Sequence, residues 1–80
     1  MTRRYEVVVA CDAAEDAENA LKAWDSWSDY KIGSQALRRL RAAYINRIAR
    51  LKRVLSALTA VELAVVLDKG HGDIIRCALP

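Results

Sequence analysis

The sequence has few of the residues that usually carry chemistry. It contains one His, two Cys, one Pro, three Gly and no Phe. Two distant cysteines and one His are too few for a zinc site, and two cysteines do not make a disulfide scaffold. We therefore predict no metal, no cofactor and reduced thiols at Cys11 and Cys77, with a Cys11–Cys77 bridge as the alternative. No apolar run approaches the roughly 18 residues that span a membrane, so we expect a cytoplasmic protein with no membrane partner.

The single imidazole is the only candidate for acid–base catalysis. His71 stands between Gly70 and Gly72, with Asp68 and Asp73 nearby, and a carboxylate could orient it as a general base. The same residues are typical of an exposed turn, and this interpretation is favoured. The sequence shows no nucleophile elbow and no Gly-rich phosphate loop. We therefore predict no catalytic residue and no enzyme.

Charge is strongly segregated along the 80 residues, which we expect to form a single domain, 1–80. Residues 1–30 hold three basic and seven acidic groups, a net charge of −4. Residues 34–59 hold seven basic groups and no acid. This polarity bears on partners rather than on fold.

The segment 34–58 is predicted to be a long amphipathic helix. Ser34 follows Gly33 and is a typical N-cap residue. Apolar residues then recur at steps of three and four, the period of one helix face. At about 100° per residue, the cations lie opposite or beside this apolar face. The apolar residues are Leu37, Leu40, Tyr44, Ile48, Leu51, Leu55 and Leu58.

The rest of the chain predicts an α+β fold of order β–α–α–β–β, a three-stranded antiparallel sheet with both helices packed on one face. β-Branched residues favour a strand at 4–10, and alternation favours strands at 61–67 and 73–79. Asp12 and Glu15 resemble a capping box, so the first helix is expected at 12–28, followed by a loop at 29–33. Thr59 and Glu62 form another such pair, so the alternative is a short third helix at 60–69 with two strands. The expected core is Tyr5, Val7, Val9, Leu21, Trp24, Trp27, Leu40, Tyr44, Ile48, Leu51, Leu55, Val65, Leu67, Ile75 and Cys77.

The order of strand, capped helix, loop and Gly-Ser-capped basic helix (RRYEVVVACDAAEDA…GSQALRRL) is similar to that of ribbon–helix–helix repressors. The resemblance covers roughly the first 50 residues. It implies that a two-stranded ribbon reads the major groove and that a helix N-terminus holds a phosphate. Arg4, Glu6 and Val8 would then face bases, with Gly33 and Ser34 on the DNA backbone. In a second nucleic-acid hypothesis, the basic helix 34–58 contacts a line of phosphates and does not read bases.

A third class of function is protein binding, and we favour it. In size and general build the chain looks like small phage-encoded inhibitors, anti-CRISPR proteins among them, which would place it in a host cytoplasm. We predict a non-enzymatic module that acts by occupancy, as a monomer or homodimer, on an acidic protein surface. The predicted partner-binding residues are Arg38, Arg39, Asn46, Arg50 and Arg53. Arg suits this role because its planar fork pairs bidentately with carboxylate or phosphate.

Overall fold

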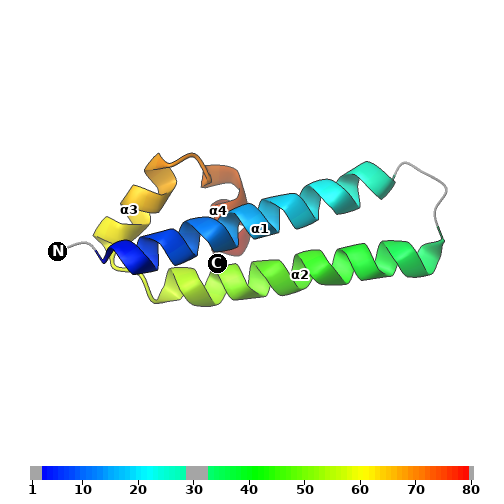
Figure 1. The fold of residues 1–80 in the computed structure, drawn as a ribbon, viewed down its shortest axis with the longest axis horizontal. Helices are drawn as coiled ribbons and strands as arrows, with labels where there is room; N and C mark the ends of the chain where they lie inside the picture. Colours follow the sequence, from blue (N-terminus) through cyan, green and yellow to red (C-terminus); the bar gives the residue numbers. More distant parts are fainter. Residues whose placement is uncertain (1–2, 29–32, 80) are drawn as a thin grey trace.

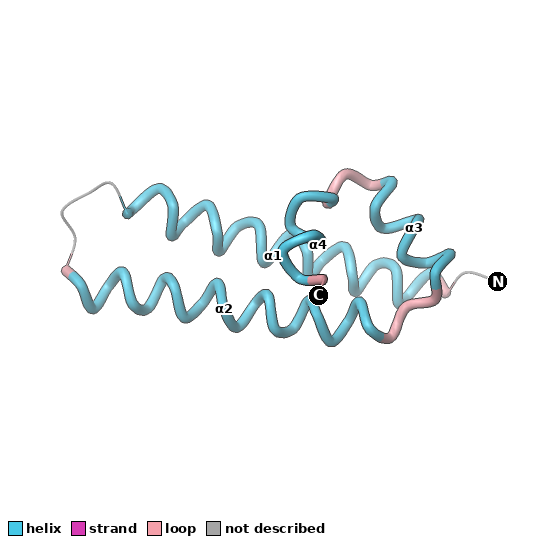
Figure 2. The backbone as a smooth tube through the Cα atoms, turned by 180° about the vertical axis from the view of Figure 1, so that it is seen from behind, coloured by secondary structure: helices cyan, strands magenta, loops and turns pink. Residues whose placement is uncertain are grey.

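The chain folds into four α-helices (Figure 1). The computed structural model describes residues 3–28 and 33–79, and no strand occurs among them. The helices are α1 (Arg4–Ser28), α2 (Ser34–Ser56), α3 (Ala60–Asp68) and α4 (Gly72–Ala78). Helices α1 and α2 form a long antiparallel hairpin, and the molecule measures 49 × 21 × 19 Å. Seen from behind, α3 and α4 pack on one side of this hairpin, in the half near the N-terminus (Figure 2).

The predicted three-stranded α+β fold is therefore wrong, beginning with the strand at 4–10. Helix α1 begins eight residues before the expected Asp12 and runs without interruption to Ser28. The reason is a stripe with helical spacing that continues upstream of Asp12 and overrides local β-propensity. This stripe steps by three and four through Val7, Ala10, Ala14, Ala17, Leu21 and Trp24.

The two C-terminal strands are also wrong, because 61–67 and 73–79 lie mainly in α3 and α4. The alternative prediction had the third helix right and its two strands wrong. Thr59 Oγ1 accepts from the Glu62 N–H at 3.2 Å, and Glu62 Oε1 accepts from the Thr59 N–H at 2.9 Å. This reciprocal capping box starts α3. Gly70, at φ 96°, then provides the left-handed residue that ends it.

The basic helix is confirmed, with small corrections at both ends. Gly33 is the N-cap residue, and Ser34 is the first residue of α2 with no side-chain cap bond. The helix ends at Ser56, two residues before the predicted end at 58. Of the predicted loop 29–33, residues 29–32 lie outside the described residues.

The core is built largely from small side chains at the helix seams. Ala10, Ala13, Ala14 and Ala17 of α1 are buried, and small residues let helices approach closely. The prediction of Val7, Leu51, Leu55 and Ile75 as buried is confirmed; Tyr5, Trp27, Leu67 and Cys77 are exposed. The remaining predicted core residues are partly buried. Buried residues missing from the prediction are Ala10, Ala13, Ala14, Ala17, Glu62, Val66, Ile74 and Ala78.

In the described part of the chain, no helix combines the length and apolar character needed to cross a membrane.

Candidate protein-binding surface on α2

All five predicted partner-binding residues lie on α2 and are exposed, but they do not form one group. At about 100° per residue, Arg39, Asn46, Arg50 and Arg53 fall within about 60° of one another. We call these four residues the basic stripe. Arg38 lies about 100° from Arg39 and about 60° from Arg53, so it borders the stripe on the side away from Arg50.

The second flank carries Arg38, Arg41 and Lys52, and it faces the side of the hairpin on which α4 packs. Lys52 lines a shallow groove of about 470 Å³ together with Leu55 and the end of α4 at Ala78 and Leu79. The basic stripe lies on the opposite flank, toward the side of α1 that α3 and α4 leave uncovered. The structure therefore divides the basic back of α2 into two faces with different neighbours.

The basic stripe is closer to α1 than expected for a purely outward surface. The Arg50 guanidinium donates to an Asp16 carboxylate oxygen at 3.2 Å, and both side chains are about half exposed, at 47% and 50%. Exposed pairs of this kind contribute about 0–1 kcal/mol. Asp12 lies one helical turn before Asp16 and is also exposed. The stripe thus meets a carboxylate of the neighbouring helix at Arg50.

The rest of the basic surface has no such partner within residues 3–28 and 33–79. Among the described residues, Arg50 is the only α2 cation in an ion pair. The six others are Arg38, Arg39, Arg41, Arg47, Lys52 and Arg53, and all are exposed. Their charges are therefore available to a partner at little desolvation cost.

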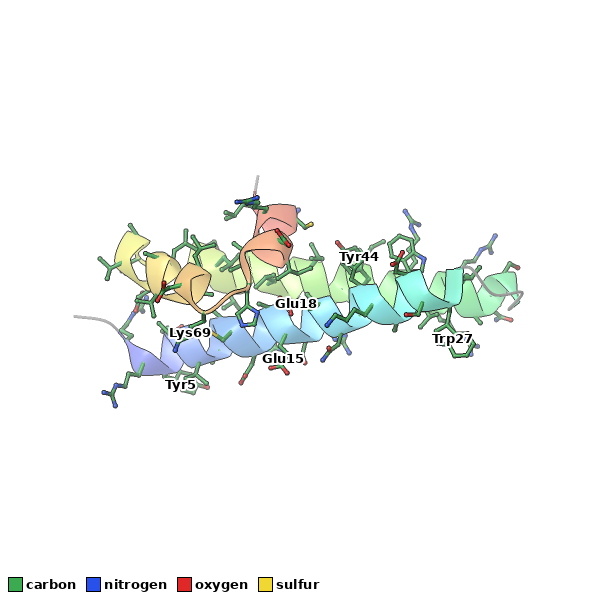
Figure 3. All side chains as sticks on the ribbon, turned by 90° about the horizontal axis from the view of Figure 1, so that it is seen from above. Tyr5, Glu15, Glu18, Trp27, Tyr44 and Lys69 are labelled. Atoms are coloured by element: carbon green, nitrogen blue, oxygen red, sulfur yellow. The ribbon has the colours of Figure 1, made fainter. Side chains whose placement is uncertain are left out.

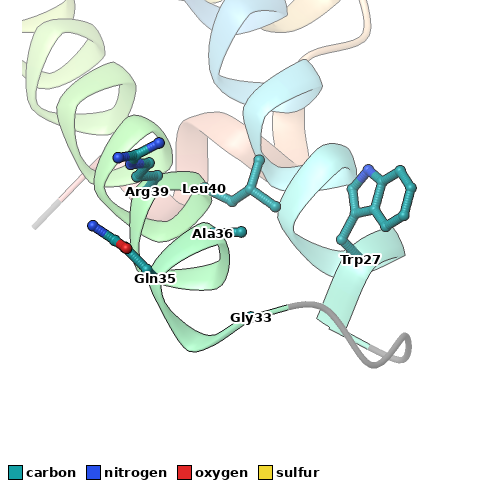
Figure 4. A pocket seen from close by; sticks show the side chains of 6 residues that line it. All are labelled: Trp27, Gly33, Gln35, Ala36, Arg39 and Leu40. Atoms are coloured by element: carbon teal, nitrogen blue, oxygen red, sulfur yellow. The ribbon is translucent and has the colours of Figure 1, made fainter.

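An apolar groove adjoins the stripe where the hairpin turns. It has a volume of about 690 Å³ and is lined by Ala36 and Leu40 of α2 and by Trp27 of α1. Figure 4 shows Leu40 pointing toward α1 and Trp27 on the other side of that helix in this view. Arg39 and Gln35 stand at its polar edge. Trp27 and Leu40 were predicted to lie in the core, so this groove was not predicted. The combination of an apolar groove with a planar cation at its edge is typical of protein-binding hot spots.

The one imidazole joins two elements. His71 Nδ1 lies 2.9 Å from Glu18 Oε1, so the turn between α3 and α4 is tied to α1. The carboxylate partner is thus Glu18 and not the predicted Asp68 or Asp73, and the side chain is mostly buried rather than exposed on a turn.

The cysteines are free thiols, and both lie in helices, although Cys77 belongs to the segment 73–79 that was predicted to be a strand. Partial burial raises the pKa of the Cys11 thiol. Burial likewise raises the pKa of the Tyr44 hydroxyl, and the neighbouring Cys77 thiol raises it further. Within residues 3–28 and 33–79, no three or more His, Cys, Asp and Glu side chains are placed to hold a metal ion.

The ribbon–helix–helix resemblance depends on a strand at residues 4–10 that would read bases, and these residues are helical. Arg4, Glu6 and Val8 lie in α1, so residues 4–10 form no ribbon that could enter a major groove. Comparison with protein-family models, with curated proteins and with solved structures finds no match for this chain.

Proposed function

We propose that the protein is a non-enzymatic binding module that acts by occupying an acidic surface of a partner protein, as a small inhibitor does. The observation that carries this proposal is the set of six exposed cations on α2 that have no ion pair among the described residues. A helix of this kind presents a strong positive field to an approaching partner.

A protein partner fits this surface better than a nucleic acid does. The stripe from Arg39 to Arg53 spans about 21 Å, enough to follow several phosphates. A phosphate line along it would also pass the exposed carboxylates of Asp12 and Asp16 on α1. Like charges at short range repel. A protein surface carries both signs and can match the cations and the carboxylates together.

The groove beside Arg39 supplies the second part of the interaction. An apolar partner side chain between Ala36 and Leu40 would bury apolar area, while Arg39 pairs with a flanking carboxylate. The partner segment that fits is therefore acidic with an apolar anchor.

The test compares two variants with the same change in net charge. Arg39→Glu/Arg53→Glu reverses two stripe residues, and Arg4→Glu/Arg76→Glu reverses two exposed cations on α1 and α4. A partner is captured from lysate on immobilised wild type, identified by mass spectrometry, purified and titrated against both variants. We expect the stripe variant to lose binding by about tenfold or more and the control to retain it.

A parallel titration separates the two classes of partner. Poly-glutamate and a short DNA duplex are bound to the wild type at increasing salt. If the duplex binds more tightly and its affinity falls with log salt in proportion to the phosphates contacted, the phosphate hypothesis replaces the protein one. Equal binding by the stripe variant and the wild type would contradict both hypotheses.

A further inference from the structure

Helix α2 carries two regularly spaced rows of residues on opposite sides. The apolar row faces the interior: Leu51 and Leu55 are buried, and Tyr44 lies beside Trp24 of α1 with ring centroids 5.6 Å apart (Figure 3). The second row steps by three, four, three, four and three, which is the spacing of the a and d positions of a coiled-coil seam. We call this row the outer seam. Its residues are Arg39, Ala42, Asn46, Ala49, Arg53 and Ser56.

The outer seam alternates long polar residues with small ones. Arg, Asn and Arg occupy one heptad position, and Ala, Ala and Ser occupy the other. All six residues are exposed except Ala49, which is partly buried. In a coiled coil, four residues of one helix form the hole that receives a side chain of the facing helix. In the first such hole of the outer seam, Ala42 and Ala43 stand between Arg39 and Asn46, so their small side chains leave room for a large apolar one.

The polar groups of the outer seam are available to a partner. Neither Arg39 nor Arg53 has an ion pair within residues 3–28 and 33–79. The Ser56 hydroxyl donates to the Arg53 carbonyl oxygen at 2.8 Å, so it is satisfied inside the helix. Arg50 lies beside the seam and contacts Asp16 at 3.2 Å, which marks the edge where α1 begins. The two seam arginines can therefore pair with carboxylates from outside at little cost.

We propose that the outer seam binds one α-helix of the partner protein, which carries a carboxylate at every seventh residue and apolar side chains between them. This inference rests on the proposed function, because it names the form of the acidic segment that the basic stripe binds. Charge complementarity favours this occupant, since Arg39 and Arg53 each pair with a carboxylate. Helix α2 of a second copy does not fit, because α2 carries seven cations and no acid, and like charges repel.

The spacing favours a helix over an extended segment. Seven residues of α2 rise by about 10.5 Å, and a partner helix has the same rise, so its residues at steps of seven face Arg39, Asn46 and Arg53 in turn. An extended strand covers about 10 Å in three residues, but side chains three apart point to opposite faces. A strand would therefore meet the two arginines and turn away from Asn46. The seam drifts by about 20° per heptad, and a crossing angle of about 20° between the helices compensates for this drift.

Two peptides of the same composition test the helical partner. Each has about 21 residues, long enough to form a helix, with three Glu and two Leu among Ala and Gln. The register peptide has Glu at every seventh position and Leu three residues after the first two. The scattered peptide keeps Leu in place and has Glu at every fifth position, so its carboxylates point about 140° apart. Circular dichroism compares their helix content, and a lactam bridge is added to both if the content differs.

Binding is measured from the amide chemical shifts of the labelled protein. We expect the register peptide to bind the wild type about tenfold more tightly than the scattered peptide and to shift signals between Arg39 and Arg53. Ala42→Leu fills the first hole without changing the charge, and Ala64→Leu makes the same change at an exposed position of α3. The first variant should weaken binding of the register peptide by about tenfold, and the second should leave it unchanged.

The outcomes separate this inference from the proposed function. If the wild type binds both peptides equally and Arg39→Glu/Arg53→Glu binds neither, the stripe attracts acids without a preferred register, so the helix inference fails and the proposed function stands. If Ala42→Leu binds the register peptide as tightly as the wild type does, the contact lies outside the outer seam. If neither peptide binds the wild type at low salt, the seam recognises no acidic helix, and the titration of the captured partner decides the proposed function. Undiminished binding by Arg39→Glu/Arg53→Glu would contradict both.

Discussion

Arg3 and Glu62, fifty-nine residues apart, are joined by three hydrogen bonds that hold the start of α1 to the start of α3. Glu62 Oε2 accepts from the Arg3 N–H at 2.9 Å and from Nε at 3.0 Å, and Oε1 accepts from Nη2 at 2.9 Å. The same carboxylate accepts from the Thr59 N–H. The buried Glu62 carboxylate thus accepts hydrogen bonds from backbone N–H groups at the N-termini of both α1 and α3. The helix dipole favours an anion at such a position.

Glu62→Gln should therefore destabilise the protein strongly. The amide keeps the shape of the carboxylate but loses its charge, and at this fully buried position it replaces one hydrogen-bond acceptor with a donor that faces the N–H groups of Arg3 and Thr59. We expect the thermal midpoint to fall by about 10 °C or more, measured by circular dichroism at neutral pH. Asp68→Asn, an exposed acid of the same helix, is the control and should change the midpoint little. Similar midpoints for the two variants would mean that the Arg3–Glu62 contact is not maintained in solution.

Acid should unfold the protein through the same group. The Arg3 guanidinium, and then the Thr59 N–H, hold the pKa of the Glu62 carboxyl well below its usual range, although burial acts in the opposite direction. Since the folded pKa is lowered, the unfolded chain binds more protons, and stability rises with pH in this window. The stabilisation is complete above about pH 4.5, near the unfolded value, and is lost as pH falls toward the folded pKa.

Urea unfolding between pH 2 and pH 6 measures this dependence. The wild type should lose stability steeply below about pH 4.5. Glu62→Gln has no carboxyl at this position, so its curve should be flatter over the same range. Parallel curves for the two proteins would assign the acid sensitivity to other carboxylates.

The basic helix could be predicted from the sequence because its apolar period is made of large residues. Leu51 and Leu55 are obvious core positions, and both are buried. Helix α1 was harder because Ala fills the equivalent positions, and Ala is also compatible with an exposed surface. The run Val7-Val8-Val9 then favoured a strand locally, although Val7 already belonged to the helical stripe.

The candidate site was predictable only in part. The exposure of the five predicted partner-binding residues could be predicted, because they lie away from the apolar face of the helix. The Asp16–Arg50 pair depends on how α1 and α2 are rotated against each other, and spacing within one helix does not determine this rotation. The sequence did not predict that the buried Glu62 pairs with Arg3, because Arg3 lies near the other end of the chain. Only the capping-box pattern with Thr59 indicated its role.

The alanine seam gives a third prediction. Ala17 is completely buried in the core cluster, so Ala17→Leu inserts a larger side chain into the packed interior. Overpacking of this kind costs about 1–3 kcal/mol. Ala64→Leu makes the same change at an exposed position of α3 and should be nearly neutral. Urea unfolding compares them, and a stabilised Ala17→Leu would show that the seam contains unfilled space.

The last prediction concerns the one stripe residue that contacts α1. Arg39→Glu and Arg53→Glu should leave stability nearly unchanged, because neither side chain has an ion pair among the described residues. Arg50→Glu should cost up to about 1 kcal/mol, since it replaces an attraction to Asp16 with a repulsion. Asp16→Lys should cost a similar amount, and the double variant Asp16→Lys/Arg50→Glu should recover most of the loss.

This double-mutant cycle distinguishes a specific Asp16–Arg50 ion pair from a general attraction between the charges of α1 and α2. If the 3.2 Å contact between Asp16 and Arg50 persists in solution, the double variant is more stable than the sum of the single changes predicts. If the losses simply add, the stabilising charge is spread along α1 and α2. The stripe would then be available to a partner along its whole length, Arg50 included. With the pair intact, a partner must instead displace Asp16 before it can use Arg50, so Arg39 and Arg53 would dominate binding.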